Sequence, residues 1–334
     1  MPPIFRKTLV IPVINIDSPA VFLERNKDKT FNIQELFPGP AAPQKESGFK
    51  VAVYKIDIDD GYVHFKDNYE SLISKLLKKK LIALDVGAQG GFFNSGLFHP
   101  RYNNYFSPIL VEPIQSEAKK MELKNYKVIP KGLWSKKCSR ILYYLEKRPG
   151  SSSMFQPIKK NLNLYQFKQN NYHLFDVTKK VKVECETLKS SLKKLNIKYL
   201  DYLKIDTQGA EYEILQGIGN FLPLMIRLEV HTVPMYKNAP YWNKIINFMY
   251  QLGFIVCEWQ RIGSHATRCP VEMDMIFVPN YLTETGKRII KKRIDNFISL
   301  MLIFGQVKLL QVISSNLSFS NNRKIQELND KYFY

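Results

Sequence analysis

The stretch Leu81-Ile-Ala-Leu-Asp-Val-Gly-Ala-Gln-Gly-Gly91 is the most informative part of this sequence about the fold. Its first six residues form an apolar run that contains one acid near its end, which is typical of a strand buried on both faces of a parallel sheet. The glycines that follow let the backbone approach a ligand closely, because a Cβ would collide with it or forbid the required φ. We therefore expect a ligand pocket at the carboxyl end of this strand.

The alternation of buried strand and helix repeats along the chain. We expect further strands at 108–112, 126–133, 199–205, 224–230, 253–259 and 274–278, and helices at 114–123 and 209–217. Apolar strands separated by helices predict an α/β fold with a mostly parallel sheet and helices on both faces. Two more strands, at 138–145 and 181–187, do not fit this alternation. The basic, tyrosine-rich stretch 146–180 between them is typical of a functional or disordered loop.

The sequence pattern divides the chain into three parts. Residues 1–80 form a leader of β-like runs at 9–16, 49–58 and 62–65, with a proline-rich loop at 37–43 and a helix over 70–80. Residues 81–280 form the α/β domain, and residues 281–334 a basic helical extension. The amphipathic pattern of this extension favours packing against the domain over contact with a membrane surface or a partner through 287–313. We find no signal sequence and no membrane-spanning run, so we expect a cytoplasmic protein.

The net charge of +19 is concentrated in one part of the chain. Between Lys119 and Lys198 there are 20 Lys and Arg against five Asp and Glu. This excess indicates either a field that attracts an anionic substrate, such as a sugar phosphate, an acidic glycan or nucleic acid, or a solvated lysine-rich surface. The four cysteines have no Cys-x-x-Cys spacing, which favours reduced thiols over a zinc site or a disulfide framework.

A second acid, Glu112, ends the second predicted strand 27 residues after Asp85. In such a unit an acid at this place accepts hydrogen bonds from ribose hydroxyls, which indicates an adenosine-type ligand. The glycines at 87, 90 and 91 have the spacing G-x-x-G-G instead of the G-x-G-x-x-G of a pyrophosphate cradle. A nucleoside that carries an amino acid is therefore favoured over the dinucleotide of an NAD-binding oxidoreductase.

The most specific segment is Tyr202-Leu-Lys-Ile-Asp-Thr-Gln-Gly-Ala-Glu-Tyr-Glu-Ile-Leu-Gln-Gly217, in which a buried strand, an acid and a helix follow one another. With this segment the chain resembles FkbM-type methyltransferases over about residues 81–278. The resemblance also rests on Asp85-Val-Gly-Ala88, Val111-Glu-Pro113, the serines at 151–153, Glu186-Thr-Leu188 and Arg227-Leu-Glu-Val230. The chain departs from the family at Lys189, where an aspartate is usual, and at Gly132-Leu-Trp-Ser135, where alanine-leucine-serine-aspartate is usual.

The resemblance implies a class I methyltransferase fold that uses S-adenosylmethionine as cofactor. The acceptor it implies is a hydroxyl on a sugar, a glycan or another small hydroxylated molecule. Of the two interpretations of the charge excess, the attracting field predicts that this molecule is anionic, and the solvated surface does not. The cofactor-binding residues are then expected to be Asp85, Gly87, Ala88, Gln89, Gly90, Gly91, Glu112, Leu133 and Trp134.

Three polar residues are the candidates for catalysis. Asp206 ends the fourth strand, where the sheet should meet the methyl group, and we expect it to orient the acceptor or the sulfonium. Glu229 or His231 is the candidate general base, although a packed polar role for His231 is the competing interpretation. Asp206, Glu211, Glu229 and His231 could instead hold a divalent cation, but their spacing does not require one and no metal site is predicted.

Two other functions compete with this one. Tyr143, Tyr144, Tyr165, Phe167 and Tyr172 lie in the basic stretch and could stack on bases, as in an RNA 2′-O-methyltransferase. Such enzymes use lysines near the reactive carbon, and here no lysine follows Glu229 until Lys237. The other alternative is a non-catalytic interaction module on a methyltransferase fold, which would bind no S-adenosylmethionine.

Overall fold

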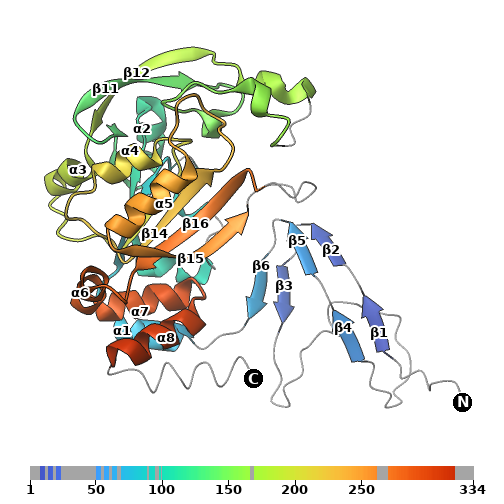
Figure 1. Cartoon of the computed structure of the whole chain (residues 1–334), viewed down its shortest axis with the longest axis vertical. Helices are drawn as coiled ribbons and strands as arrows, with labels where there is room; N and C mark the ends of the chain where they lie inside the picture. Colours follow the sequence, from blue (N-terminus) through green and yellow to red (C-terminus); the bar gives the residue numbers. More distant parts are fainter. Residues whose placement is uncertain are drawn as a thin grey trace, which may run out of the picture. The chain divides into compact units, whose positions relative to one another are not determined.

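A computed structural model of the 334-residue chain describes residues 69–319 apart from 89, 95–97, 99, 166–168 and 262–269, together with six short strands between residues 8 and 65 (Figure 1). The chain divides into two compact units, residues 1–70 and 71–334. The described residues contain no helix of the length and apolar character needed to cross a membrane.

The first unit contains three parallel pairs of short strands. Strands β1 (Thr8–Ile11) and β4 (Lys50–Val53) form one pair, β2 (Ile14–Asp17) and β5 (Ile56–Asp59) the second, and β3 (Ala20–Leu23) and β6 (Tyr62–Phe65) the third. The β-like runs expected at 9–16 and 49–58 thus each contain two strands. The proline-rich loop at 37–43 lies outside the described residues. The helix expected over 70–80 is α1 (Tyr69–Leu76).

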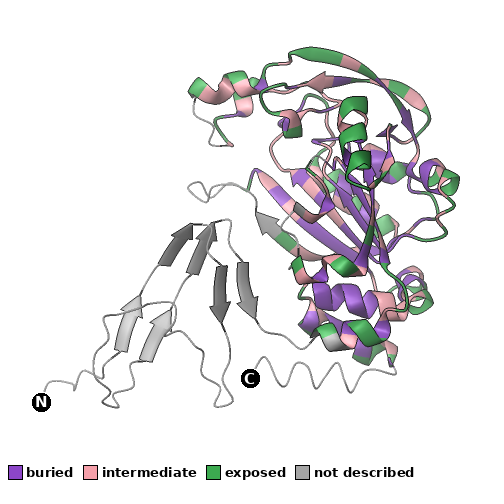
Figure 2. Ribbon diagram, turned by 180° about the vertical axis from the view of Figure 1, so that it is seen from behind, coloured by how far each residue is buried: buried purple, intermediate pink, exposed green. Residues whose placement is uncertain are grey.

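The second unit is built on a seven-stranded, mostly parallel sheet, as the sequence predicts. Its order is β15-β16-β14-β13-β7-β8-β9. The strands are β7 (Leu81–Val86), β8 (Phe106–Val111), β9 (Lys127–Ile129), β13 (Tyr202–Ile205), β14 (Met225–His231), β15 (Phe254–Arg261) and β16 (Glu272–Pro279). Only β16 runs antiparallel to both of its neighbours. The central strands β7 and β13 are almost fully buried, which explains why they lack alternation (Figure 2).

Four helices lie between strands in the chain order: α2 (Gln115–Leu123), α3 (Leu188–Lys194), α4 (Glu211–Gln216) and α5 (Trp242–Gln251). Three tail helices follow, α6 (Glu284–Lys292), α7 (Ile294–Ile303) and α8 (Val307–Leu317), and their apolar side chains are largely buried. Arg293 donates hydrogen bonds to the carbonyl oxygens of Leu200 and Leu222, shortly before β13 and β14. The start of α7 therefore lies at the amino ends of these strands, opposite the edge where the pocket is expected.

A second sheet of three strands has the order β10-β12-β11. It contains β10 (Gly132–Leu133), β11 (Cys138–Tyr144) and β12 (Lys179–Glu186), so both additional strands are present. Between β11 and β12 the chain forms the short 3-10 helices η4 (Pro149–Ser151), η5 (Lys159–Asn161) and η6 (Gln169–Phe175). The expectation of one strand over 126–133 is wrong. The segment splits between the two sheets at Pro130, which has no amide hydrogen to donate.

Candidate functional site

A cleft at the carboxyl edge of the central sheet opens to solvent, and the space within it, solvent included, is about 740 Å³. Gly87, Glu112 and Asp206, which directly follow β7, β8 and β13, line its floor. Other lining residues come from the second sheet and from the turn after its strand β11: Leu133, Leu142, Tyr144, Pro149, Gly150 and Ser152. Residues far apart in the chain thus surround a single pocket.

The glycine turn after β7 lies in close contact with the end of β13. Gly87 has a φ of +84°, and a Cβ on it would lie 1.9 Å from the carbonyl oxygen of Asp206. Glycine is therefore required because the ends of β7 and β13 touch. Ala88 is buried, and Gly90 and Gly91 also have positive φ values. Gln89, which was predicted to bind cofactor, lies outside the described residues.

Asp85 lies beneath the cleft and is not part of its lining. Its Oδ1 is 3.2 Å from Nζ of Lys204, which lies 3.4 Å from Oδ2 of Asp206. Burial raises the pKa of Asp85, and Lys204 opposes that rise. Burial disfavours the charge on Lys204, but the two carboxylates outweigh it and raise the pKa of Lys204. Lys204 therefore links the acid of the first strand to Asp206, which lines the cleft.

Glu112 faces the cleft while it is only 7% exposed. Its Oε1 accepts a hydrogen bond of 2.8 Å from the amide of Ile114. Burial, with a smaller contribution from Glu117, raises the pKa of Glu112 to about 7, and the Ile114 hydrogen bond opposes this rise. Near neutral pH this carboxyl group can accept hydrogen bonds from hydroxyl groups at the end of β8, where the sequence predicts ribose recognition.

The two residues expected near the adenine lie in different places. Leu133 is buried and lines the cleft. Trp134 is also buried but does not line the cleft. Its amide donates a hydrogen bond to the carbonyl oxygen of Glu186, and the Arg140 guanidinium lies 4.3 Å from the centre of its ring. The structure therefore gives Trp134 a packing role beside the cleft.

Gln208, which sequence reasoning missed, connects Asp206 to Glu229 and to two other polar residues. Its Nε2 donates to Oδ1 of Asp206 at 3.1 Å and to Oε1 of Glu229 at 2.5 Å. The hydroxyl of Tyr236 lies 2.7 Å from its Oε1, and Ser153 donates to its carbonyl oxygen at 2.7 Å. A φ of +59° at Gln208 turns the chain here. Only its place two residues after the strand-end acid Asp206 could have marked it in the sequence.

Glu211 stabilises the turn that precedes α4. Its Oε1 accepts hydrogen bonds from the amide and hydroxyl of Thr207, at 2.9 and 3.0 Å, and from the amide of Gly209, at 3.2 Å. The residue is 1% exposed. These contacts explain why Glu211 does not join a cation site of the kind considered above.

Glu229 and His231 do not line the cleft and lie beyond Gln208, beside Glu272. Nε2 of His231 is 3.3 Å from Oε1 of Glu272 and 3.8 Å from Oε1 of Glu229. Burial raises the pKa of Glu229 well above its usual range, and Asp206, Glu272 and Asp274 add to this rise. Glu272 is a second residue that the sequence did not single out, because it approaches the others only through the pairing of β16 with β14.

A comparison with known protein families gives a match over the part of the chain that contains these cleft residues. Residues 85–256 match the family described as the methyltransferase FkbM domain, which covers 172 of the 334 residues. The match begins at Asp85 and includes Gly87, Glu112, Leu133 and Asp206, which line the cleft. No curated protein matches the chain. The chain belongs to the FkbM methyltransferase family.

Proposed function

We propose that this protein is an S-adenosylmethionine-dependent O-methyltransferase with a class I methyltransferase fold. Its acceptor in this proposal is a hydroxyl on a sugar, a glycan or a similar small molecule. The observation that carries the proposal is the convergence of Gly87, Glu112, Leu133 and Asp206 on one cleft. Gly87, Glu112 and Asp206 directly follow three different strands of the central sheet, at the edge where open α/β sheets bind their ligands, and Leu133 is the last residue of β10 in the second sheet.

The lining supports a specific placement of the cofactor. Glu112 would accept hydrogen bonds from the ribose hydroxyls, and Leu133 would lie against the adenine. The amino-acid end would approach the glycine turn, which brings the methyl group toward Asp206. Asp206 is the lining carboxylate at the end of β13, and both Lys204 and Gln208 hold it in place.

Methyl transfer needs little more than alignment and the removal of one proton. S-adenosylmethionine bound in the cleft would supply the methyl group: its sulfur–methyl bond would break with the electron pair left on sulfur, the methyl group would bond to the acceptor oxygen, and the hydroxyl proton would pass to a base. We assign to Asp206 the orientation of the acceptor hydroxyl. Glu229 and His231 stay the predicted candidates for the base, and Gln208 connects Glu229 to the cleft residue Asp206.

The surroundings of the cleft support an anionic acceptor. A second hollow shares Pro113, Ile114 and Tyr144 with the cleft. Lys131, Lys179 and Lys182 line this hollow, and all three are exposed. A phosphate or carboxylate group on the acceptor would be attracted to this side of the cleft.

Calorimetry on the full chain tests the proposal. S-adenosylmethionine and its demethylated product should each bind with one site per chain. Glu112→Gln should weaken this binding, whereas Glu122→Gln, which removes the same charge from an exposed position on α2, should not. Absence of binding to the folded wild-type chain would refute the proposal and favour the non-catalytic module.

A second measurement identifies the acceptor. Labelled S-adenosylmethionine would be incubated with fractionated glycans, lipids and RNA. Label on a glycan or a small hydroxylated molecule supports the proposed acceptor. Label on RNA, together with salt-dependent retention of the protein on RNA, would replace it with the RNA 2′-O-methyltransferase.

A further inference from the structure

We propose that Glu229, His231 and Glu272 form a binding site for one divalent metal ion. These residues do not line the cofactor cleft, although Glu229 and His231 are also the candidates for the base in the proposed methyl transfer. Metal binding to them can be measured without that reaction. Among the residues that the structure describes, only these three offer His, Cys, Asp or Glu ligand atoms that all lie within 4.8 Å of one another.

The strand register places the three side chains together. His231 and Glu272 are direct partners across the antiparallel pair of β14 and β16. Glu229 lies two residues before His231, and side chains two apart in a strand point to the same face of the sheet. The site is thus built on two hydrogen-bonded strands rather than on loops, which favours a fixed geometry.

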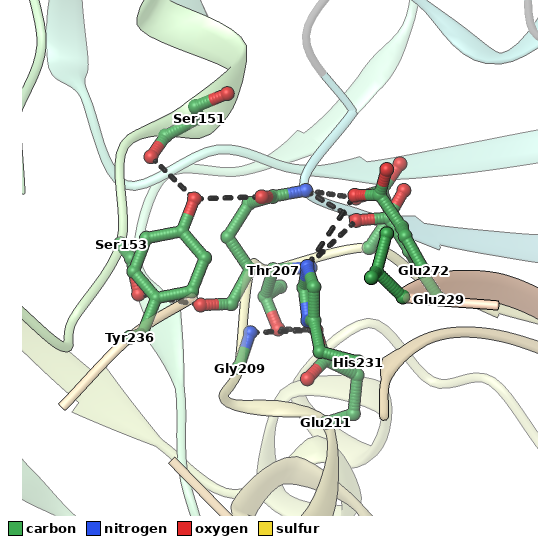
Figure 3. Close-up of polar contacts among 12 residues, drawn as sticks. Ser151, Ser153, Thr207, Gly209, Glu211, Glu229, His231, Tyr236 and Glu272 are labelled. Atoms are coloured by element: carbon green, nitrogen blue, oxygen red, sulfur yellow. Dashed lines mark hydrogen bonds and ion pairs between the residues drawn. The ribbon is translucent and has the colours of Figure 1, made fainter. Parts of the chain in front are cut away.

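The distances suit ligands of one ion. Ligand atoms about 2.1 Å from a metal at octahedral or tetrahedral angles are about 3.0–3.4 Å apart. Nε2 of His231 lies 3.3 Å from Oε1 of Glu272 and 3.8 Å from Oε1 of Glu229 (Figure 3). All three ligand atoms lie within 4.8 Å of one another, so each pair is within about 2 Å of the spacing that one ion requires.

His231 provides an independent indication of a ligand. Its side chain is 9% exposed, and its buried Nε2 has no hydrogen-bond partner among the described residues, although it points toward both carboxylates. Buried polar nitrogen atoms normally have such a partner. The rings of Tyr165 and Tyr236 lie near the imidazole, at centroid distances of 6.0 and 5.7 Å. Nε2 of His231, which is buried without a hydrogen-bond partner and lies near both carboxylates, is the atom that would bind the ion.

The charge balance leads to the same conclusion. The neighbouring acid Asp274 is paired with Arg227, whereas the described residues place no Lys or Arg in an ion pair with Glu229 or Glu272. A divalent ion would neutralise both acids and bind the free imidazole nitrogen. Two carboxylates and one imidazole, without a thiolate, suit ions such as Mn²⁺, Fe²⁺ or Zn²⁺.

Mn²⁺ binding to the full chain, followed by electron paramagnetic resonance without S-adenosylmethionine, tests the site. We expect saturable binding of one Mn²⁺ per chain. Glu272→Gln and His231→Gln should each weaken it by at least about tenfold. Glu146→Gln removes the same charge as the first variant at an exposed position outside the site and should bind as the wild type does.

The outcomes separate this site from the proposed function. Wild-type protein without saturable Mn²⁺ binding, or a folded Glu272→Gln variant with undiminished affinity, would overturn the metal site. Glu272 is the variant less prone to disturb the fold, since its side chain is 20% exposed. S-adenosylmethionine binding is measured separately by calorimetry, so a chain that binds the cofactor but no Mn²⁺ contradicts only the metal site. A chain that binds Mn²⁺ but no cofactor contradicts only the proposed function.

Discussion

Replacing Glu112 by glutamine should move stability and cofactor affinity in opposite directions. Burial raises the pKa of this carboxyl group from 4.5 to about 7 in the folded protein. Since one pKa unit corresponds to about 1.4 kcal/mol, charging Glu112 costs folding up to about 3 kcal/mol. The neutral glutamine can still accept the hydrogen bond from the amide of Ile114, so this cost is removed without the loss of that contact.

The sign follows from the two protonation states. Below about pH 4.5 the group is protonated in both the folded and the unfolded chain, so wild type and Glu112→Gln should have similar free energies of unfolding. Between about pH 4.5 and 7 the unfolded chain releases the proton and the folded chain retains it, so the wild type loses stability relative to the variant. Above about pH 7 the difference should be constant, with the variant more stable by up to about 3 kcal/mol.

Urea unfolding without cofactor at about pH 4.5 and pH 8 measures this difference, and calorimetry at pH 8 measures binding. The variant should bind S-adenosylmethionine about 10–100-fold more weakly, because a hydrogen bond to a charged group contributes about 1.5–3 kcal/mol. The reasoning about burial is refuted if the two proteins show the same stability difference at both pH values. Unchanged affinity in the variant would refute the assignment of Glu112 to the ribose.

Three further substitutions test other parts of the structure. Asp206→Asn should lower kcat for methyl transfer by at least about 100-fold with little change in thermal stability, and an undiminished rate would contradict its role in orienting the acceptor. Gly87→Ala should destabilise the fold by more than about 2 kcal/mol in urea unfolding, because its Cβ would lie 1.9 Å from the carbonyl oxygen of Asp206; wild-type stability would show that this close approach is relaxed at little cost. Arg293→Ala removes the ion pair, 2.8 Å long, to the fully buried Asp201 and should cost about 3–5 kcal/mol of unfolding free energy. Lys291→Ala, on the exposed side of α6, is the control, and an equal loss in both variants would contradict the importance of the ion pair.

The central sheet could be predicted because its strands are buried on both faces. Leu81–Val86 and Tyr202–Ile205 are continuous or nearly continuous apolar runs, and such runs followed by helices indicate parallel strands. The prediction was wrong where local chemistry interrupts a run. Pro130 divides the stretch 126–133 between two sheets, and the apolar pattern alone contains no signal for the change of sheet.

The candidate site was predictable only in part. Gly87, Glu112 and Asp206 follow strands, and strand ends can be located from the apolar pattern, so their convergence could be expected. Gln208 and Glu272 could not be found in this way. Gln208 reaches Glu229 because of a left-handed turn, and Glu272 meets His231 because of a particular register between β16 and β14.

By itself, the sequence determined the mostly parallel sheet, the place of the glycine turn and the membership of the FkbM family, because apolar runs and short motifs can each be recognised from neighbouring residues. Only the tertiary structure decided that Asp85 lies beneath the cleft against Lys204, and that Gly87 is required by the backbone of Asp206. It also decided that Glu229, His231 and Glu272 face one another. The physical reason is that burial, pairing and strand register join residues more than 40 positions apart, and local sequence pattern contains no information about such distances.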